Sequence, residues 1–253
     1  MASESDEMPH IEIAAEKIFY FFGLPVTNTL LTSWIVAALL VAAAILIKKG
    51  INIVPSGLQN IFEFFVEKFL GTMEGVFGTR ERAEKYFPVV ATIFIFVLLS
   101  NWFGILPGIG SVGFTEEHEG KEIFVPFFRS SASDINFTLA LAIVAVFVVN
   151  ILGISAIGFG KHVSKFISFK GPIDFFVGIL EFISEIAKMI SFAFRLFGNV
   201  FAGEVLLVIT AFLVPYFIPV PFLALEIFVG FVQALVFAML TMVFISIAVA
   251  HEH

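Results

Sequence analysis

Arg195 has the clearest chemical consequence in this chain, because it is a permanent cation within the apolar run 191–204. Apolar sequence of helical character continues on both sides, so we expect the guanidinium to lie within the hydrocarbon of a membrane. An arginine at the centre of a spanning helix costs about 2.5–3.5 kcal/mol on insertion scales, and a guanidinium keeps its proton in proteins. A charge retained at that depth indicates an ion pathway or a partner. A buried structural ion pair is the competing interpretation.

Other polar residues on the same predicted helix lie on two different faces, which indicates that an ion pathway here has two separate compartments. At 100° per residue, Glu181 and Asn199 each lie about 40° from Arg195, so the three share one broad face. Glu204 falls about 180° away from Arg195 and about 13 Å along the axis. Glu204 is therefore not an intrahelical partner of Arg195, and we interpret the two charges as belonging to separate polar compartments. Lys188 follows Glu185 by three residues, so a simple ion pair is an alternative to a role in ion transfer.

The last apolar segment contributes Glu226 and Gln233, seven residues apart and hence on one helical face. The side-chain carbonyl of Gln233 can accept a hydrogen bond from a guanidinium on a neighbouring helix, although a lone amide also serves as helix-packing contact. Glu226 lies near the outer end of its predicted helix, where a carboxylate can meet external water. Burial raises the proton affinity of intramembrane carboxylates, so we interpret Glu226 as a proton carrier.

Asp134, Asn136 and Thr138 open another apolar segment, and we expect Asp134 to act as its N-cap. The sequence contains no glycine-rich phosphate loop, no His-Glu-x-x-His and no Gly-x-Ser-x-Gly. We therefore expect that this chain alone neither binds ATP or another cofactor nor performs covalent catalysis.

The elements that position these residues follow from hydropathy. Of the 253 residues, 59% are hydrophobic and only 14% are charged, which indicates an integral membrane protein. The pattern predicts an all-α polytopic membrane protein with about five transmembrane helices and one interfacial helix, in a single membrane domain. Its predicted parts are an external N-terminal segment 1–27, spans 28–48, 87–107 and 135–160, an interfacial helix 55–79, an external loop 108–134, and a hairpin of 173–213 and 221–251.

The interfacial helix and the hairpin depart from ordinary spans in different ways. Between 57 and 77 apolar residues recur at helical spacing opposite a face of glutamates, which favours a helix in the membrane interface over one packed in a small cytoplasmic lobe. The two hairpin segments are about 60 Å and about 45 Å long as helices, against about 30 Å of hydrocarbon. Continuous helices of this length must tilt steeply, whereas a kink at Gly198 or Gly203 is the alternative.

Basic residues set the expected orientation. Eight basic residues occur in loops that the first three spans would place together on one side: Lys48, Lys49, Arg80, Arg82, Lys85, Lys161, Lys165 and Lys170. The loop on the opposite side is acidic. The positive-inside rule then predicts an external N-terminus and a cytoplasmic C-terminus.

The segment from Arg195 to Glu204, Arg-Leu-Phe-Gly-Asn-Val-Phe-Ala-Gly-Glu, closely resembles the signature of subunit a of F-type ATP synthases. Further matches are the segments 133–138, 101–107 and 233–241, which occur in the family's order. The resemblance implies a bacterial inner-membrane stator subunit whose last two helices form a tilted hairpin around a rotor ring of c-subunits. It also implies contacts with the b-subunit peripheral stalk and the remainder of the F1Fo complex.

Within that family, the residue matching Arg195 faces the rotor carboxylate between two offset aqueous half-channels. The resemblance assigns Glu204 to the external half-channel, Gln233 to the vicinity of the arginine, and Glu181 to the cytoplasmic side. Some relatives carry histidine where this chain has Glu226, which implies an external channel lined by two carboxylates. A secondary transporter or channel with an arginine anion site and a non-conducting membrane scaffold are the alternative functions.

Overall fold

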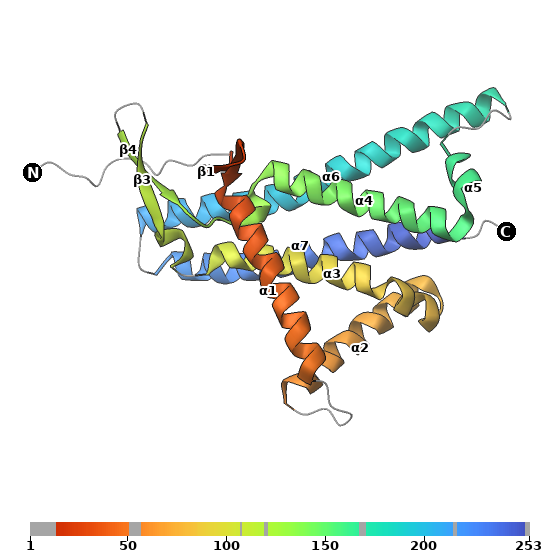
Figure 1. Ribbon diagram of the computed structural model, residues 1–253, viewed down its shortest axis with the longest axis horizontal. Helices are drawn as coiled ribbons and strands as arrows, with labels where there is room; N and C mark the ends of the chain where they lie inside the picture. The colour runs from red at the N-terminus through yellow and green to blue at the C-terminus, as the bar shows by residue number, and fades with distance from the viewer. Residues whose placement is uncertain are drawn as a thin grey trace, which may run out of the picture. The chain divides into compact units, whose positions relative to one another are not determined.

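The computed structural model describes residues 14–50, 57–106, 108–118, 121–166, 171–214 and 217–250. In these ranges five helices are long and apolar enough to cross a membrane (Figure 1): α1 (Asn28–Gly50), α3 (Arg80–Ile105), α4 (Ile135–Ile157), α6 (Pro172–Leu213) and α7 (Pro219–Val249). Two further helices, α2 (Leu58–Phe77) and the short α5 (Phe159–Val163), have no such span. The predicted all-α polytopic membrane fold is confirmed.

The chain packs into two compact units, and each is described by itself. Unit 1 consists of Met1–Ala38, Phe96–Thr138 and Ala193–Ala234, and unit 2 of Leu39–Ile95, Leu139–Phe192 and Leu235–His253. All five long helices contribute residues to both units.

In unit 2, α2 packs an apolar face against α3. Phe65 and Phe69 both contact the ring of Phe94, at centroid distances of 5.7 and 5.5 Å, and Met73 is fully buried. The glutamates of α2 remain exposed, as an amphipathic helix requires. Gly78 caps the C-terminal end of α2: its φ of 77° is a left-handed conformation that glycine adopts without strain, and its N–H donates to the Glu74 carbonyl.

Helix α3 begins at Arg80, earlier than the span expected from Phe87. The hydroxyl of Thr79 accepts from the N–H of Arg82 as an N-cap, and Arg80 Nε donates to Glu84 Oε1 at 2.9 Å. Local capping and an i,i+4 ion pair therefore extend the helix into polar sequence that hydropathy assigns to a loop.

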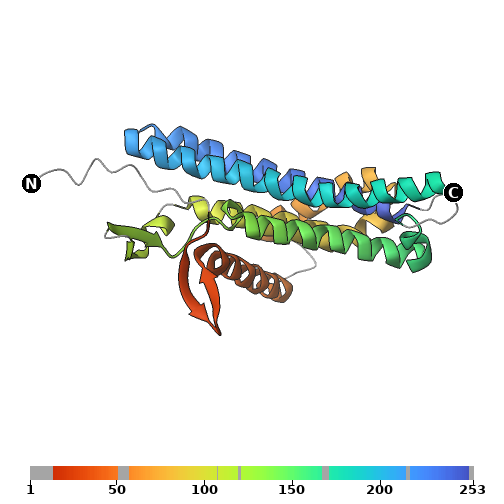
Figure 2. The same cartoon turned by 90° about the horizontal axis from the view of Figure 1, so that it is seen from above.

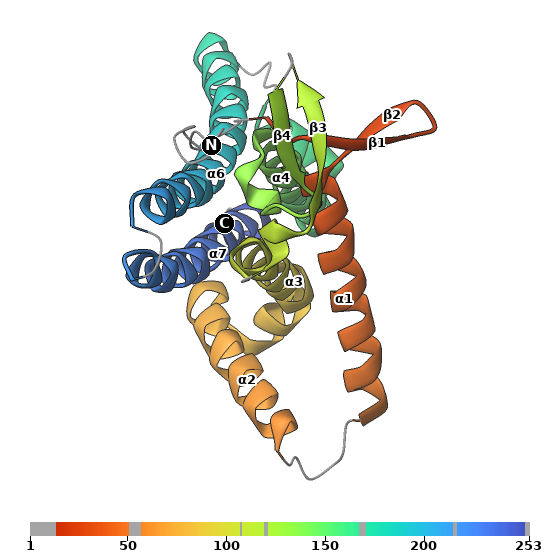
Figure 3. The ribbon, with the colours of Figure 1, turned by 90° about the vertical axis from the view of Figure 1, so that its left-hand side faces the viewer.

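In unit 1, two β-hairpins occupy segments for which we predicted no regular structure. β1 (Lys17–Phe21) pairs with β2 (Leu24–Thr27) next to the start of α1, and β3 (Gly113–His118) pairs with β4 (Lys121–Pro126) (Figures 2 and 3). The first turn places Phe22 and Gly23 at φ of 50° and 82°. Positive φ at both central residues is typical of a type I′ turn, but a phenylalanine at the first position is an uncommon sequence signal for it.

The hairpin of long helices is present, with α6 of 42 residues and α7 of 31 residues. Helix α6 runs without interruption through Gly198 and Gly203, so the kink considered above does not break it. Each helix begins with a proline, Pro172 and Pro219, at a position where no intrahelical N–H bond is lost. Within unit 1 the second half of α6 runs beside the first half of α7 (Figure 1).

Candidate functional site

The central contact of unit 1 is an ion pair between Arg129 and Glu204. The Nε of Arg129 donates to Oε1 of Glu204 at 2.8 Å, and the exposed fractions of the two side chains are 8% and 29%. Arg129 follows β4, whereas Glu204 lies on α6. Because a charged pair that is mostly removed from water has few competing partners, this contact fixes the position of the Glu204 carboxylate.

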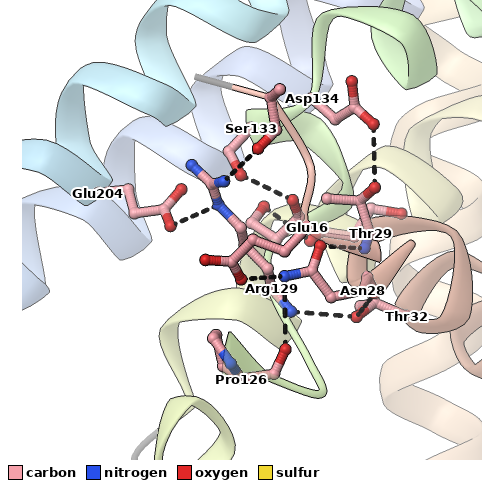
Figure 4. A network of polar contacts seen from close by, with 12 residues as sticks. Glu16, Asn28, Thr29, Thr32, Pro126, Arg129, Ser133, Asp134 and Glu204 are labelled. Atoms are coloured by element: carbon pink, nitrogen blue, oxygen red, sulfur yellow. Dashed lines mark hydrogen bonds and ion pairs between the residues drawn. The ribbon is translucent and has the colours of Figure 1, made fainter. Parts of the chain in front are cut away.

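Several polar groups hold Arg129 in place (Figure 4). Its backbone N–H donates to the hydroxyl of Thr32 on α1, and its guanidinium also reaches the carbonyl of Ala14 at 3.4 Å. Close by, Asn28 donates to Glu16 Oε2 at 2.9 Å and to the Pro126 carbonyl at 3.4 Å. Contacts from the start of α1 and from the segment before β1 therefore set where the guanidinium meets α6.

Asp134 caps α4 as predicted, and it also extends this polar network. Its Oδ1 accepts from the backbone N–H of Asn136 at 2.8 Å and from the Asn136 side chain at 3.2 Å. Its Oδ2 accepts from the hydroxyl of Thr29 at 3.0 Å. Asp134 is buried and Asn136 is exposed, so Asp134 joins α4 to α1 while Asn136 lies at the surface.

Glu226 on α7 is buried and packs against α6 at a glycine. A Cβ added at Gly203 would lie 2.9 Å from Oε1 of Glu226, closer than packed atoms allow. The absence of a side chain at Gly203 thus makes room for the carboxyl group, one residue before Glu204. Among the described residues, Oε2 of Glu226 and Oε2 of Glu204 are both buried without a hydrogen-bond partner. Each is an acceptor position suited to a proton.

The end of α3 fixes the same stretch of α7. The side-chain amide of Asn101 donates to the Gly230 carbonyl, and the indole N–H of Trp102 donates to the Ile227 carbonyl, both at 3.0 Å. A Cβ at Gly230 would lie 3.2 Å from Cβ of Asn101, so the glycine permits the close approach. These bonds hold the turn that carries Glu226.

Asn199 and Gln233 join α6 to α7 directly. The Nδ2 of Asn199 donates to Oε1 of Gln233 at 2.7 Å, and Gln233 is only 4% exposed. The carbonyl oxygen of Gln233, which the sequence offers as an acceptor for a guanidinium or as a helix-packing contact, accepts from Asn199. Arg195 and Asn199 are both exposed on α6, whereas Leu196 between them is fully buried. The face that carries Arg195 is therefore directed away from the unit 1 core.

Unit 2 contains a second polar cluster, around a cavity of about 50 Å³. Glu181, Glu185 and Lys188 of α6 line it together with Asn150 of α4 and His162 of α5. Lys188 donates to Glu185, as the three-residue spacing predicts, and its ammonium also lies 5.0 Å from the centre of the Phe244 ring. Since a water needs about 10–15 Å³ of such volume, the cavity has room for a few water molecules.

The predicted site residues are divided between the two units. Glu181 and Lys188 belong to unit 2. The others belong to unit 1: Asp134, Asn136, Arg195, Asn199, Glu204, Glu226 and Gln233. Sequence reasoning missed Arg129, Asn150 and His162. The only sequence signal for Arg129 is that it is one of two bases in an otherwise acidic loop. Among the described residues, no three acidic or histidine side chains form a group that could hold a metal ion.

Residues 30–246 match the family model described as ATP synthase A chain. The chain is similar to proteins named ATP synthase subunit a from several bacteria. It is 30% identical to that of Moorella thermoacetica over 91% of this chain and 94% of the relative. For Campylobacter jejuni the identity is 34%, over 94% and 93% of the two chains. For Mycobacterium marinum it is also 34%, over 99% and 98%.

Proposed function

This chain belongs to the ATP synthase A chain family, and on that premise we propose that it forms two offset half-channels carrying protons to and from a rotor ring of c-subunits. Protons pass from outside by Glu226 and Glu204 to a rotor carboxylate, which then turns into lipid as a neutral group. After nearly a full revolution the carboxylate reaches the second half-channel, near Glu181, and releases its proton. The membrane potential supplies about 2.3 kcal/mol per charge per 100 mV to drive this cycle.

The exposure of Arg195 is the observation that carries the proposal. Its side chain is exposed on α6, although the neighbouring Leu196 is fully buried. A permanent charge exposed on such an apolar helix suits a partner that brings its own carboxylates. A facing guanidinium favours the ionised form of such a carboxylate and repels a hopping proton, which prevents leakage between the half-channels.

Two separate polar clusters support two half-channels. The carboxyl groups of Glu204 and Glu226 belong to unit 1, and Glu181 belongs to the cavity of unit 2. Arg195 lies between Glu181 and Glu204 in sequence on the same helix. Within the part of the chain that the structure describes, Oε2 of Glu204 and Oε2 of Glu226 are buried without a hydrogen-bond partner, and a proton can be bound there.

Charge distribution supports an orientation in the bacterial inner membrane. The basic residues Lys48, Arg82 and Lys161, at or near helix ends, belong to unit 2, whereas Glu116 and Glu117 on β3 belong to unit 1. By the positive-inside rule, these basic residues lie on the cytoplasmic side, with the N-terminus outside and the C-terminus inside. The same proposal includes the b-subunit peripheral stalk and the rest of F1Fo as partners.

The first test is Arg195→Ala in the complete ATP synthase reconstituted into vesicles. We expect proton-driven ATP synthesis to be lost while all subunits still co-purify. Arg82→Gln, which removes an exposed arginine elsewhere, is the control and should leave synthesis unchanged. Near-normal synthesis by an assembled Arg195→Ala complex would rule out the barrier role of Arg195.

The second test separates the half-channels by direction. With the proton gradient imposed from outside, Glu204→Gln should slow proton uptake more than Glu181→Gln does, because only Glu204 lies on the proposed external path. Initial rates of pH change inside and outside the vesicles measure the two steps. Equal effects of the two variants under a one-directional gradient would contradict the assignment of the two clusters.

A further inference from the structure

His162 is buried although it lies on the short helix α5 between two lysines in sequence. Its exposed fraction is 5%, whereas Lys161 beside it is exposed. The imidazole lines the 50 Å³ cavity of unit 2 and packs edge-on against Phe166 at a centroid distance of 5.7 Å. A histidine removed from water at the rim of a polar cavity has restricted hydrogen-bonding partners, so its protonation can be deduced from them.

The neighbours of Asn150 determine the tautomer of His162. The side-chain amide nitrogen of Asn150 donates to the Val146 carbonyl at 2.9 Å and toward Glu185 Oε2 at 3.4 Å. Both partners are acceptors, so the group 2.9 Å from Nε2 of His162 is the carbonyl oxygen Oδ1 of Asn150. Because that oxygen only accepts, Nε2 carries the hydrogen, and Nδ1 of the neutral ring has a free lone pair.

The Nδ1 atom of His162 is buried, and it has no hydrogen-bond partner among the described residues. A Cβ added at Gly153 of α4 would lie 2.9 Å from Cε1 and 3.0 Å from Nδ1 of His162. The glycine therefore gives the ring its position at the cavity. An unpartnered, buried basic nitrogen on a residue that lines a polar cavity is suited to accept a proton.

We propose that His162 is a proton-exchanging residue that links the unit 2 cavity to the water on the lysine-rich side of the protein. This inference rests on the proposed function, since it adds a residue to the half-channel that contains Glu181. Nδ1 accepts a proton from water in the cavity, giving an imidazolium that keeps its bond to Asn150. The imidazolium then gives that proton to water on the lysine-rich side, so only N–H and O–H bonds change.

The charges around the ring suit rapid release. Burial lowers the pKa of His162, the nearby Lys165 lowers it further, and Glu185 acts in the opposite direction. The remaining charged groups of the cavity are Glu181 and Lys188 on α6; from α7 it is lined by apolar side chains, Phe244, Ile247 and Ala248. A depressed pKa means that the protonated ring gives up its proton readily near neutral pH.

The test uses the complete ATP synthase in vesicles, with proton flow driven from outside and the cytoplasmic-side pH varied from about 5 to 8, the range in which histidine titrates. In the unmodified enzyme, flow should fall on the acid side, where the imidazolium cannot accept a further proton. His162→Gln should lower proton flow by about tenfold. This is less than the roughly 10²–10⁴-fold loss for a group in contact with reacting atoms, because water can partly replace the imidazole in proton transfer. The same substitution should also abolish the acid-side decline.

The glutamine keeps a donor for Asn150 but cannot titrate. If His162 has only a structural role, the pH profile of His162→Gln should therefore equal that of the unmodified enzyme.

Lys165→Gln gives a second test that leaves His162 in place. Loss of the neighbouring positive charge should move the midpoint of the acid-side decline to higher pH, whereas the exposed control Lys161→Gln should not. Unchanged profiles in both His162→Gln and Lys165→Gln would overturn the inference. If Arg195→Ala still blocks flow in that case, the proposed function itself stands.

Discussion

The guanidinium of Arg129 holds the carboxylate of Glu204 across 75 positions of sequence, with Nε 2.8 Å from Oε1. The loop after β4 thus provides the counter-charge for a helix residue that helical geometry places opposite Arg195. Under the proposed function the two arginines have different tasks. Arg129 positions a carboxylate of this chain, whereas Arg195 meets carboxylates of the rotor.

Removal of either partner should leave a largely buried charge without its counter-charge. We expect Arg129→Gln to destabilise unit 1 by up to about 3 kcal/mol, somewhat below the usual loss for a buried pair because Glu204 keeps some exposure. The double variant Arg129→Gln/Glu204→Gln should be less destabilised than the sum of the single variants. Thermal denaturation midpoints of the detergent-solubilised complex measure this, with exposed Arg82→Gln as control. Additive effects would show that the pair is not coupled.

Gly203→Ala should change function more than stability. Alanine in a helix interior is favoured over glycine by about 0.5–1 kcal/mol, and the atom it meets is the mobile end of the Glu226 side chain. We therefore expect an undiminished denaturation midpoint, with proton uptake from outside slowed because the Glu226 carboxyl is displaced. Gly71→Ala on the exposed part of α2, where a Cβ meets no atom within 4 Å, is the matched control. A large loss of stability in Gly203→Ala would mean that Glu226 does not move.

The hydrogen bond between Asn199 and Gln233 should contribute measurably to the pairing of α6 with α7. A double-mutant cycle with Asn199→Ala and Gln233→Ala should give a coupling energy of about 0.6 kcal/mol, the mean for hydrogen bonds between membrane helices. Denaturation midpoints again measure it. Thr241→Val, which removes a bond within α7 only, should show no coupling to Asn199→Ala. A coupling near zero between Asn199 and Gln233 would contradict the bond.

The corner between α2 and α3 should loosen in acid. Glu67 accepts two hydrogen bonds from Arg80, and the bonds and charge of Arg80 hold the pKa of Glu67 below its ordinary value of 4.5. Because the folded-state pKa is the lower one, the pair stabilises the corner fully above pH 4.5, and the contribution is lost as the pH falls through the folded value.

Hydrogen exchange in α2 as a function of pH measures this effect. Protection factors, which correct the exchange rates for the intrinsic slowing of amide exchange in acid, should fall in acid in the unmodified protein, and Arg80→Gln should show the low values already at neutral pH. The exposed acid Glu81 serves as the matched control, since Glu81→Gln leaves the Glu67–Arg80 pair intact. An acid response that persists in Arg80→Gln would assign it to other groups.

Local properties of the sequence account for the number of spanning helices, the unusual length of the last two, the amphipathic α2 and the Asp134 cap. Hydropathy, helical spacing and capping each depend on residues within one or two turns, so neighbouring residues suffice to predict them. The early start of α3 and the β1–β2 turn were not predicted, although they too depend on neighbouring residues. At these places a specific hydrogen bond or an uncommon φ outweighs the average preference of the sequence.

The partners of the charged and polar side chains depend on contacts between elements that are distant in sequence. The side-chain spacing on α6 separates Glu204 from Arg195, but nothing along α6 indicates that an arginine after β4 will reach it. The same holds for Gly203 beside Glu226 and for His162 beside Asn150 and Gly153. These contacts exist because whole helices pack at particular separations and rotations, and those depend on the summed fit of many side chains rather than on any local pattern.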